Sequence, residues 1–402
     1  MNALPLTLLA PDRRRHGDEI CDFVAKVFSG NGYYAFRRFC RRGYGLGSHY
    51  DWAASRIGLL DGRIVAHWGV WDYQMRIGAA RVRAGGIGIV GTDGDLRKRG
   101  LMARTARASL AAMRALGYDL SILFGIEEFY HRFGYVRAWS DTTWMVRLAD
   151  LPKERPTLRP KRFTPVRRDD ISRLYNREYA AATGTVVKPT YGRGMYPRPS
   201  IGYLWSDARG RPAGYVIVFR KGAQIECIEA CGDAGECLRV LAALGRRWGA
   251  QEIQFSTFSD AWPLIRRLSQ GTCRAETRHV RSGGPMVATI NLGRTLGHMA
   301  GELERRLRES PMTDWRGNLL VAGGRDSATL AIARSRVTVS SGGRGAAHAV
   351  RGGDHVAQLL IGADDPREIA EAGRMKVTGD AGRLLGVLFP AQHPQLSLRD
   401  RV

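Results

Sequence analysis

Cysteine is scarce in this chain, and its distribution excludes two kinds of site. The 402 residues include six cysteines, at positions 21, 40, 227, 231, 237 and 273, and no two of them form a CxxC pair. No histidine lies near enough in sequence to the cluster between 227 and 237 to complete the spacing of a zinc site. We therefore expect no metal centre and no disulfide framework, and we interpret the cysteines as small buried hydrophobic residues.

Long apolar runs are also missing. No stretch approaches the roughly 20 residues that span a bilayer. At the start of the chain the basic cluster at residues 13–15 follows the apolar residues, which is the reverse of the order in a secretory signal. This pattern predicts a soluble, cytoplasmic protein with no membrane partner.

Acidic residues are few relative to basic ones. The chain has 38 Asp and Glu against 62 Lys and Arg, which gives a formal net charge of +24. The excess is spread along the chain rather than gathered in a stripe, and no nucleic-acid-binding motif accompanies it. Charge alone raises the hypothesis of a nucleic-acid partner. We expect none, and interpret part of the charge as a means of attracting a small polyanion.

The most informative stretch runs from residue 84 to residue 116. It predicts a short apolar strand at Ile87–Val90, a turn-prone loop, the basic run RKRG at residues 97–100, and an alanine-rich helix. The first N–H groups of a helix lack intrahelical partners, and the helix dipole adds positive charge there. A basic turn before such a helix is therefore a candidate pyrophosphate site.

The motif is neither a Walker loop nor a GxGxxG fingerprint. Its order, Arg97-x-x-Gly100-x-x after a strand, resembles the acyl-CoA loop of the GNAT acetyltransferase superfamily, [RQ]-x-x-G-x-[GA], from which Met102 departs. Downstream, the run FYHRFGY at residues 129–135 resembles the segment that closes a GNAT active site. The length and three-part layout further resemble the enhanced intracellular survival (Eis) type, which has two GNAT-type domains and a sterol-carrier-protein-like domain.

This resemblance implies an α+β (mixed α/β) fold with two GNAT-type mixed-sheet domains and a final sterol-carrier-like α+β domain. The expected boundaries are 1–150 for the catalytic domain that binds acetyl-CoA, 151–290 for a degenerate second domain, and 291–402 for the third domain with its C-terminal tail. An antiparallel meander with a turn at Asp61-Gly62 precedes the central stretch, and residues 144–147 are expected to finish the first sheet. In the second domain Asp233 and Glu236 stand where the basic loop would be, which predicts loss of coenzyme binding.

The resemblance implies acetyl-CoA as co-substrate, without a metal. The helix start holds the pyrophosphate, the end of the preceding strand pairs with the pantetheine amides, and a backbone N–H at Val90 or Gly91 supplies the oxyanion site. Coenzyme binding is thereby assigned to Val90, Gly91, Thr92, Lys98, Arg99, Gly100, Leu101, Met102, Ala103, Gly125 and Ile126.

Two catalytic roles are also implied. The usual pKa of a tyrosine, about 10, exceeds the value of about 8.5 for a thiol. A tyrosine is therefore protonated at neutral pH and can donate a proton to the leaving thiolate. The resemblance gives this role to Tyr130 rather than Tyr135, and the alternative is that Tyr130 only packs beside the coenzyme. In this family the C-terminal carboxylate, here that of Val402, enters the pocket as the base. Other carboxylates remain open as substitutes: Asp400, Glu127 and Glu128.

The function predicted from these residues is an acetyl-CoA-dependent N-acetyltransferase acting on an amine of a small molecule. That molecule is aminoglycoside-like or a metabolite or natural-product intermediate. The alternative is a non-catalytic acyl-CoA-binding sensor or scaffold. Chains of this three-part type form homo-oligomers, often hexamers, and the resemblance implies the same here.

Overall fold

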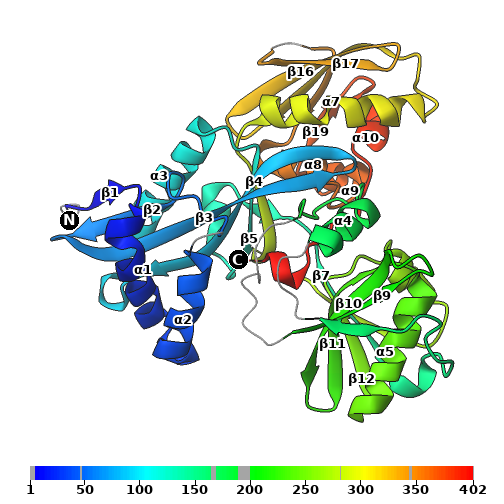
Figure 1. Ribbon diagram of the computed structural model, residues 1–402. Helices are drawn as coiled ribbons and strands as arrows, with labels where there is room; N and C mark the ends of the chain where they lie inside the picture. Colours follow the sequence, from blue (N-terminus) through cyan, green and yellow to red (C-terminus); the bar gives the residue numbers. More distant parts are fainter. Residues whose placement is uncertain are drawn as a thin grey trace. The chain divides into compact units, whose positions relative to one another are not determined.

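The computed structural model describes residues 5–45, 48–163, 169–188, 200–280, 282–343 and 346–401 (Figure 1). The chain forms two compact units. The first consists of the described parts of Met1–Ala138 and Arg281–Gln392, and the second of Trp139–Val280 and His393–Arg401. Within the described ranges, no helix combines the length and the apolar character that crossing a membrane requires.

The first unit contains a seven-stranded sheet that begins as an antiparallel meander. The predicted hairpin at Asp61-Gly62 is confirmed, and β4 and β5 form the parallel pair of the sheet. The strand order is β1-β2-β3-β4-β5-β14-β6. The strands are β1 (Thr7–Leu9), β2 (Arg56–Leu60), β3 (Arg63–Ile77), β4 (Ala80–Thr92), β5 (Leu120–Gly125), β6 (Val136–Arg137) and β14 (Gly284–Thr289).

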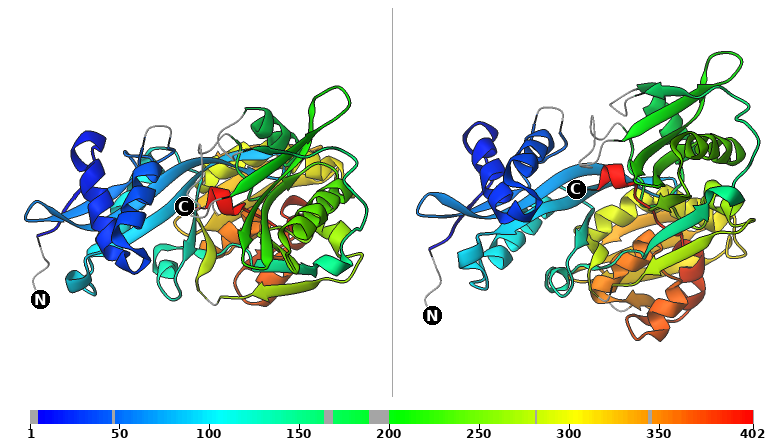
Figure 2. Two further views of the ribbon diagram at one scale, coloured as in Figure 1. Left: turned by 60° about the horizontal axis from the view of Figure 1, so that its bottom comes forward. Right: turned by 90° about the horizontal axis from the view of Figure 1, so that it is seen from below.

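Helices cover both faces of this sheet. α1 (Arg13–Val27) and α2 (Tyr33–Gly43) lie on one face, and α3 (Leu101–Ala115) lies on the other (Figures 1 and 2). The apolar residues of α3 recur at helical spacing, and those that face the sheet are buried, including Met102, Ala106 and Met113. This packing fixes the start of α3 directly after the end of β4.

One strand lies in a different sheet from the one that the sequence predicted. The expectation that residues 144–147 finish the first sheet was wrong, because β7 (Asp141–Arg147) pairs with β12 (Glu252–Ser256) and β13 (Arg274–Arg278) of the second unit. The place next to β5 is taken by β14, where Val287 lies opposite Ile122. A short alternating apolar pattern specifies which face of a strand is buried but not which sheet it joins.

The second unit repeats this layout in its own seven-stranded sheet. Its parallel pair, β11 and β12, is connected through helix α5, as β4 and β5 are through α3. The strand order is β13-β7-β12-β11-β10-β9-β8. The remaining elements are β8 (Lys161–Phe163), α4 (Asp169–Glu178), β9 (Ile201–Ser206), β10 (Pro212–Lys221), β11 (Gln224–Cys231), α5 (Ala234–Trp248), β12 (Glu252–Ser256), α6 (Pro263–Leu268) and β13 (Arg274–Arg278).

A five-stranded sheet in the C-terminal third belongs to the first unit. Helix α7 (Leu292–Arg308) ties it to the first sheet, because the Glu302 carboxylate accepts a hydrogen bond from the N–H of Ala79 at 3.3 Å and pairs with the buried Arg306 at 2.7 Å. The strand order is β17-β16-β15-β18-β19. The elements are β15 (Arg316–Gly323), β16 (Asp326–Ala333), β17 (Arg336–Ser341), β18 (His348–Arg351), α8 (Val356–Ile361), α9 (Pro366–Glu371), β19 (Lys376–Thr378) and α10 (Ala381–Leu388).

These sheets and helices confirm the predicted mixed α/β fold class. The six cysteines are free, and all but Cys273 are buried.

Candidate active site

The candidate site begins where two parallel strands part. β4 and β5 pair from Ala84 opposite Leu120 to Ile87 opposite Leu123, and β4 then continues to Thr92 without β5. Among the described residues, the edge of β4 that faces β5 therefore has no strand partner beyond Ile87. Unpaired backbone N–H and C=O groups on a strand edge can bind another extended chain with amide groups.

A bulge in β4 sets the geometry of this edge. The register between β3 and β4 shifts after His67, and Ile89 adopts a φ of +49°. A β-branched residue rarely adopts this backbone conformation, because its strain costs of order 1–3 kcal/mol. The conformation persists only where the surrounding structure enforces it. The bulge lies directly before Val90 and Gly91, so it decides where their N–H groups point.

The buried ring of His67 holds the bulge in place. Its Nδ1 lies 2.8 Å from the carbonyl oxygen of Ile89, and its Nε2 lies 2.9 Å from the hydroxyl of Tyr50. Burial lowers the pKa of His67 to about 4, so the ring is neutral at neutral pH. A carbonyl oxygen only accepts, so Nδ1 carries the proton and Nε2 accepts from Tyr50. The sequence analysis missed both residues, although a single histidine in an apolar strand was a usable signal.

The basic loop, residues 97–100, lies exposed between β4 and α3. Lys98 and Gly100 both adopt left-handed backbone conformations, with φ of +62° and +76°. Gly100 precedes α3 and no side chain caps the helix start, so the first N–H groups of α3 are not satisfied by a cap. Arg97, Lys98 and Arg99 have no ion-pair partner within the described ranges. The loop thus offers free N–H groups and three free cations to an anion.

Tyr130 lies at the start of a 3-10 turn, η3 (Tyr130–Phe133), that follows β5. Its ring packs against Trp68 at a centroid distance of 5.9 Å. A Cβ at Gly125 would lie 2.4 Å from the ring, so only glycine leaves room for the tyrosine there. Burial raises the pKa of Tyr130 to about 12, which keeps its hydroxyl protonated at neutral pH. That hydroxyl has no hydrogen-bond partner in the part of the chain that the structure describes.

Tyr135 is differently placed. It is buried, and its hydroxyl lies 2.6 Å from the hydroxyl of Ser121, which in turn lies 3.0 Å from the carbonyl oxygen of Gly85. Since that carbonyl must accept from Ser121, the Tyr135 hydroxyl donates to Ser121. The Tyr135 proton therefore belongs to a chain of hydrogen bonds that links the turn after β5 to β5 and β4.

The structure separates the remaining predicted site residues. Ile126, Glu127 and Glu128 are exposed after β5, close in sequence to Tyr130. Asp400 is buried in the second unit, where its carboxylate lies 3.8 Å from the Lys188 ammonium. Val402 lies outside the described residues.

The corresponding place in the second unit is closed by the chain itself. β11 and β12 part beyond Cys227 opposite Phe255. The Asp233 carboxylate accepts from the N–H of Glu236 at 2.7 Å and so caps α5. On the open edge of β11, the carbonyl oxygen of Ile228 accepts from the Ser397 hydroxyl at 3.2 Å. An anion at this helix start would meet a carboxylate instead of a basic loop.

Comparison with known families assigns the class of the first domain. Residues 13–138 match the family profile of the acetyltransferase (GNAT) domain. This segment contains the parted strands, the basic loop and Tyr130. The chain thus carries a GNAT domain, which supports an acyltransferase.

Solved structures show the same fold over almost the whole chain. A probable N-acyltransferase from Enterococcus faecalis is 16% identical with a TM-score of 0.74, and covers 98% of this chain and 99% of its own. A GCN5-related N-acetyltransferase from Anabaena variabilis is 14% identical with a TM-score of 0.77, at 97% and 99% coverage. Eis1 from Mycobacterium abscessus is 15% identical with a TM-score of 0.63, at 97% and 98% coverage. No curated protein matches the sequence.

Proposed function

We propose that this chain is an acetyl-CoA-dependent N-acetyltransferase that acts on an amine of a small molecule. One observation carries the proposal. Within the described residues, a basic loop without ion-pair partners at an uncapped helix start lies beside two parted strands, in the same domain as a protonated tyrosine whose hydroxyl has no hydrogen-bond partner there.

The residues present fit the coenzyme. The N–H groups of Leu101, Met102 and Ala103 and the side chains of Lys98 and Arg99 would hold its pyrophosphate. The open edge of β4 from Val90 to Thr92 would pair with the pantetheine amides, as a strand does. Gly125 and Ile126, at the end of β5, would form the other wall of that channel.

The chemistry needs three groups from the chain. The amine attacks the thioester carbonyl, whose oxygen becomes negatively charged and accepts a hydrogen bond from the N–H of Val90 or Gly91. When the carbon–sulfur bond breaks, the thiolate takes the proton of the Tyr130 hydroxyl. The nitrogen loses its proton to a base, which we assign to the Val402 carboxylate. Glu127 and Glu128 are the alternatives, because the buried Asp400 is already engaged by Lys188.

The GNAT resemblance implies that the first two helices overlie the acceptor pocket, and their charges favour an acceptor with few positive charges. Asp22 is paired with Arg37 and accepts from the Tyr33 hydroxyl at 2.8 Å, and Asp18 lies 3.2 Å from Arg41. Because these carboxylates are paired with arginines, they contribute little electrostatic attraction for a polycation. A metabolite or natural-product amine therefore fits better than an aminoglycoside.

Further features of the proposal come from the Eis-type resemblance. They are the catalytic role of residues 1–150, the degenerate character of 151–290, the sterol-carrier-like character of 291–402, a homo-oligomer such as a hexamer, and a cytoplasmic location. The alternative function is a non-catalytic acyl-CoA sensor. Retention of both Tyr130 and the basic loop favours the enzyme, since a sensor needs no proton donor.

The direct test is a thiol-release assay with acetyl-CoA and a panel of small amines, supported by calorimetric titration of the coenzyme. We expect the coenzyme to bind and at least one amine to release thiol faster than the buffer control does. Binding without release for every amine would favour the sensor, and absence of binding would contradict both functions.

A further inference from the structure

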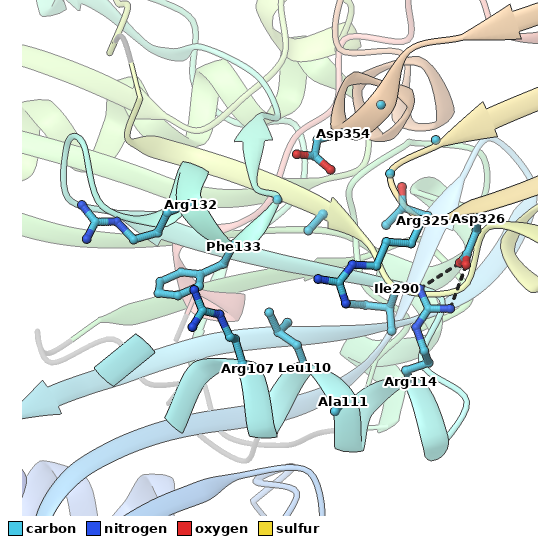
Figure 3. A pocket seen from close by; sticks show the side chains of 16 residues that line it. Arg107, Leu110, Ala111, Arg114, Arg132, Phe133, Ile290, Arg325, Asp326 and Asp354 are labelled. Carbon is cyan, nitrogen blue, oxygen red and sulfur yellow. Dashed lines mark hydrogen bonds and ion pairs between the residues drawn. The ribbon is translucent and has the colours of Figure 1, made fainter. Parts of the chain in front are cut away.

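A cavity of about 460 Å³ lies in the first unit, along the later turns of α3 (Figure 3). This volume lies in the range of about 300–1,000 Å³ that is typical of small-molecule sites. Its walls come from α3, η3, the end of β14 and two loops of the C-terminal third. We call it the arginine pocket and define it by six charged residues: Arg107, Arg114, Arg132, Arg325, Asp326 and Asp354.

The charges of the arginine pocket are unevenly satisfied. Arg114 pairs with Asp326 at 2.9 Å, and Arg132 donates to the carbonyl oxygen of Glu128 at 3.0 Å. Arg107 and Arg325 have no ion-pair or hydrogen-bond partner within the described residues, and Figure 3 shows both side chains reaching into the space beside α3. The pocket therefore has an excess of positive charge and two guanidinium groups that are free to bind.

The pocket is distinct from the proposed thioester site. α3 rises about 1.5 Å per residue, so the pocket residues of α3 lie from about 9 Å (Arg107) to about 20 Å (Arg114) along the helix from Leu101. At the far wall, Thr289 of β14 lies opposite Leu120, the first residue of β5. The parted strands open beyond Leu123, three residues or about 10 Å away along β5.

We propose that the arginine pocket binds a phosphorylated, hydroxyl-bearing small molecule that is not the coenzyme. Free guanidinium groups from two separate parts of the chain suit the several oxygens of a phosphate monoester, because each guanidinium offers a planar pair of donors. The carboxylate of Asp354 is an acceptor for the hydroxyl groups of the same ligand. The ring of Phe133 lines the pocket and gives the ligand an apolar wall.

Occupancy of the pocket would regulate turnover, a part of the inference that rests on the proposed function. η3 contributes Tyr130 to the active site and both Arg132 and Phe133 to the pocket. Tyr130 and Phe133 also pack on the same ring, that of Trp68, with centroid distances of 5.9 and 5.7 Å. A ligand that contacts Arg132 or Phe133 in the pocket therefore acts on the turn that carries the proton donor.

The binding test is a calorimetric titration of ribose 5-phosphate and of inorganic phosphate into the full chain. Ribose serves as the uncharged control, and the titration is run with and without saturating coenzyme A. We expect ribose 5-phosphate to bind in both conditions, and the R107Q/R325Q variant to bind it at least about tenfold more weakly. The matched control R63Q/R367Q removes two exposed arginines of the same unit from outside the pocket and should bind as the wild type does.

Three results would overturn the separate site. They are no uptake of either phosphate at millimolar concentration, equal affinity in R107Q/R325Q, and displacement of ribose 5-phosphate by coenzyme A but not by dephospho-coenzyme A. The last would show that the pocket holds the 3′-phosphate of the coenzyme.

The regulatory part is tested by thiol release at saturating acetyl-CoA. We expect ribose 5-phosphate to change kcat about fivefold in the wild type and not in R107Q/R325Q. Binding with unchanged kcat overturns the regulation and leaves the site. Binding with no thiol release from any amine contradicts the proposed function and leaves the site intact.

Discussion

The two parallel strand pairs of this chain separate in the same way, but the first ends beside a basic loop and the second beside a carboxylate. In the first unit, the edge beyond Ile87 stays open beside a basic loop without ion-pair partners in the described ranges. In the second unit, the edge beyond Cys227 accepts a hydrogen bond from Ser397, and Asp233 caps the helix. The same backbone frame is thus left open beside a basic loop in one unit and closed by the chain in the other, and a few side chains decide which.

The closed edge is secured by buried charges. Glu229 pairs with Lys188, accepts from the Tyr215 hydroxyl at 2.8 Å, and lies 3.4 Å from the Arg399 guanidinium. Because an unpaired buried charge is costly, these partners hold residues 397–400 on β11. At the open edge in the first unit, the described residues include no comparable set of charges between the strands.

Among the substitutions that test this comparison, Tyr130→Phe should have the largest effect, and the effect should be on kcat. Removing the hydroxyl takes away the proton donor but keeps the ring that packs on Trp68, so kcat should fall about 10²–10⁴-fold while the Kd of the coenzyme changes little. Steady-state thiol release and calorimetry measure the two quantities. Tyr135→Phe is the matched control and should retain turnover while losing about 1 kcal/mol of unfolding free energy. Equal turnover in Tyr130→Phe and the wild type would remove the acid role.

The next effect should follow from neutralising the basic loop. The double substitution Lys98→Gln and Arg99→Gln removes two cations of the loop that we propose to hold the pyrophosphate, and the Kd of acetyl-CoA should rise about 10–100-fold. Calorimetric titration measures this change. Arg209→Gln with Lys221→Gln, two exposed cations of the second unit, is the control and should bind as the wild type does. An unchanged Kd in the loop variant would place the coenzyme elsewhere.

A smaller effect should come from His67 as the pH falls. The pKa of about 4 in the folded chain lies below the usual value of about 6.5, so between these values the unfolded chain binds more protons and stability falls with the pH. The contribution should be about 2 kcal/mol between pH 7 and pH 5. Urea unfolding at both pH values measures it.

The variant His67→Gln sharpens this test, because glutamine does not titrate but can donate to the Ile89 carbonyl. We expect this variant to lose the pH dependence of about 2 kcal/mol in its unfolding free energy. It should also lower kcat more than it raises the KM of acetyl-CoA, since the bulge orients the N–H groups of Val90 and Gly91. A pH dependence equal to that of the wild type would show that another group titrates.

The smallest effect should come from Asp233→Ala in the second unit. Loss of the cap on α5 should cost about 1 kcal/mol of unfolding free energy, with coenzyme affinity unchanged. Chemical unfolding and calorimetry together check this result. Uptake of additional coenzyme by the variant would show that the carboxylate alone had kept the second site closed.

Local sequence order predicted the parts of the site that are local. The strand, basic loop and helix of residues 84–116 follow from residue patterns over short stretches, and the structure has these elements there. The pattern could not show that β7 joins the second sheet, because its alternation suits either sheet. Nor could it show that His67 meets the Ile89 carbonyl or that Asp400 approaches Lys188, because these contacts depend on tertiary packing.

The most direct test of the central claim is the stoichiometry of acetyl-CoA binding to the wild-type chain, measured by calorimetric titration. The account predicts one coenzyme per chain, because of the two strand pairs that part within the described residues, the first alone has an open edge and a basic helix start. No uptake, or two coenzymes per chain with equal affinity, would contradict it.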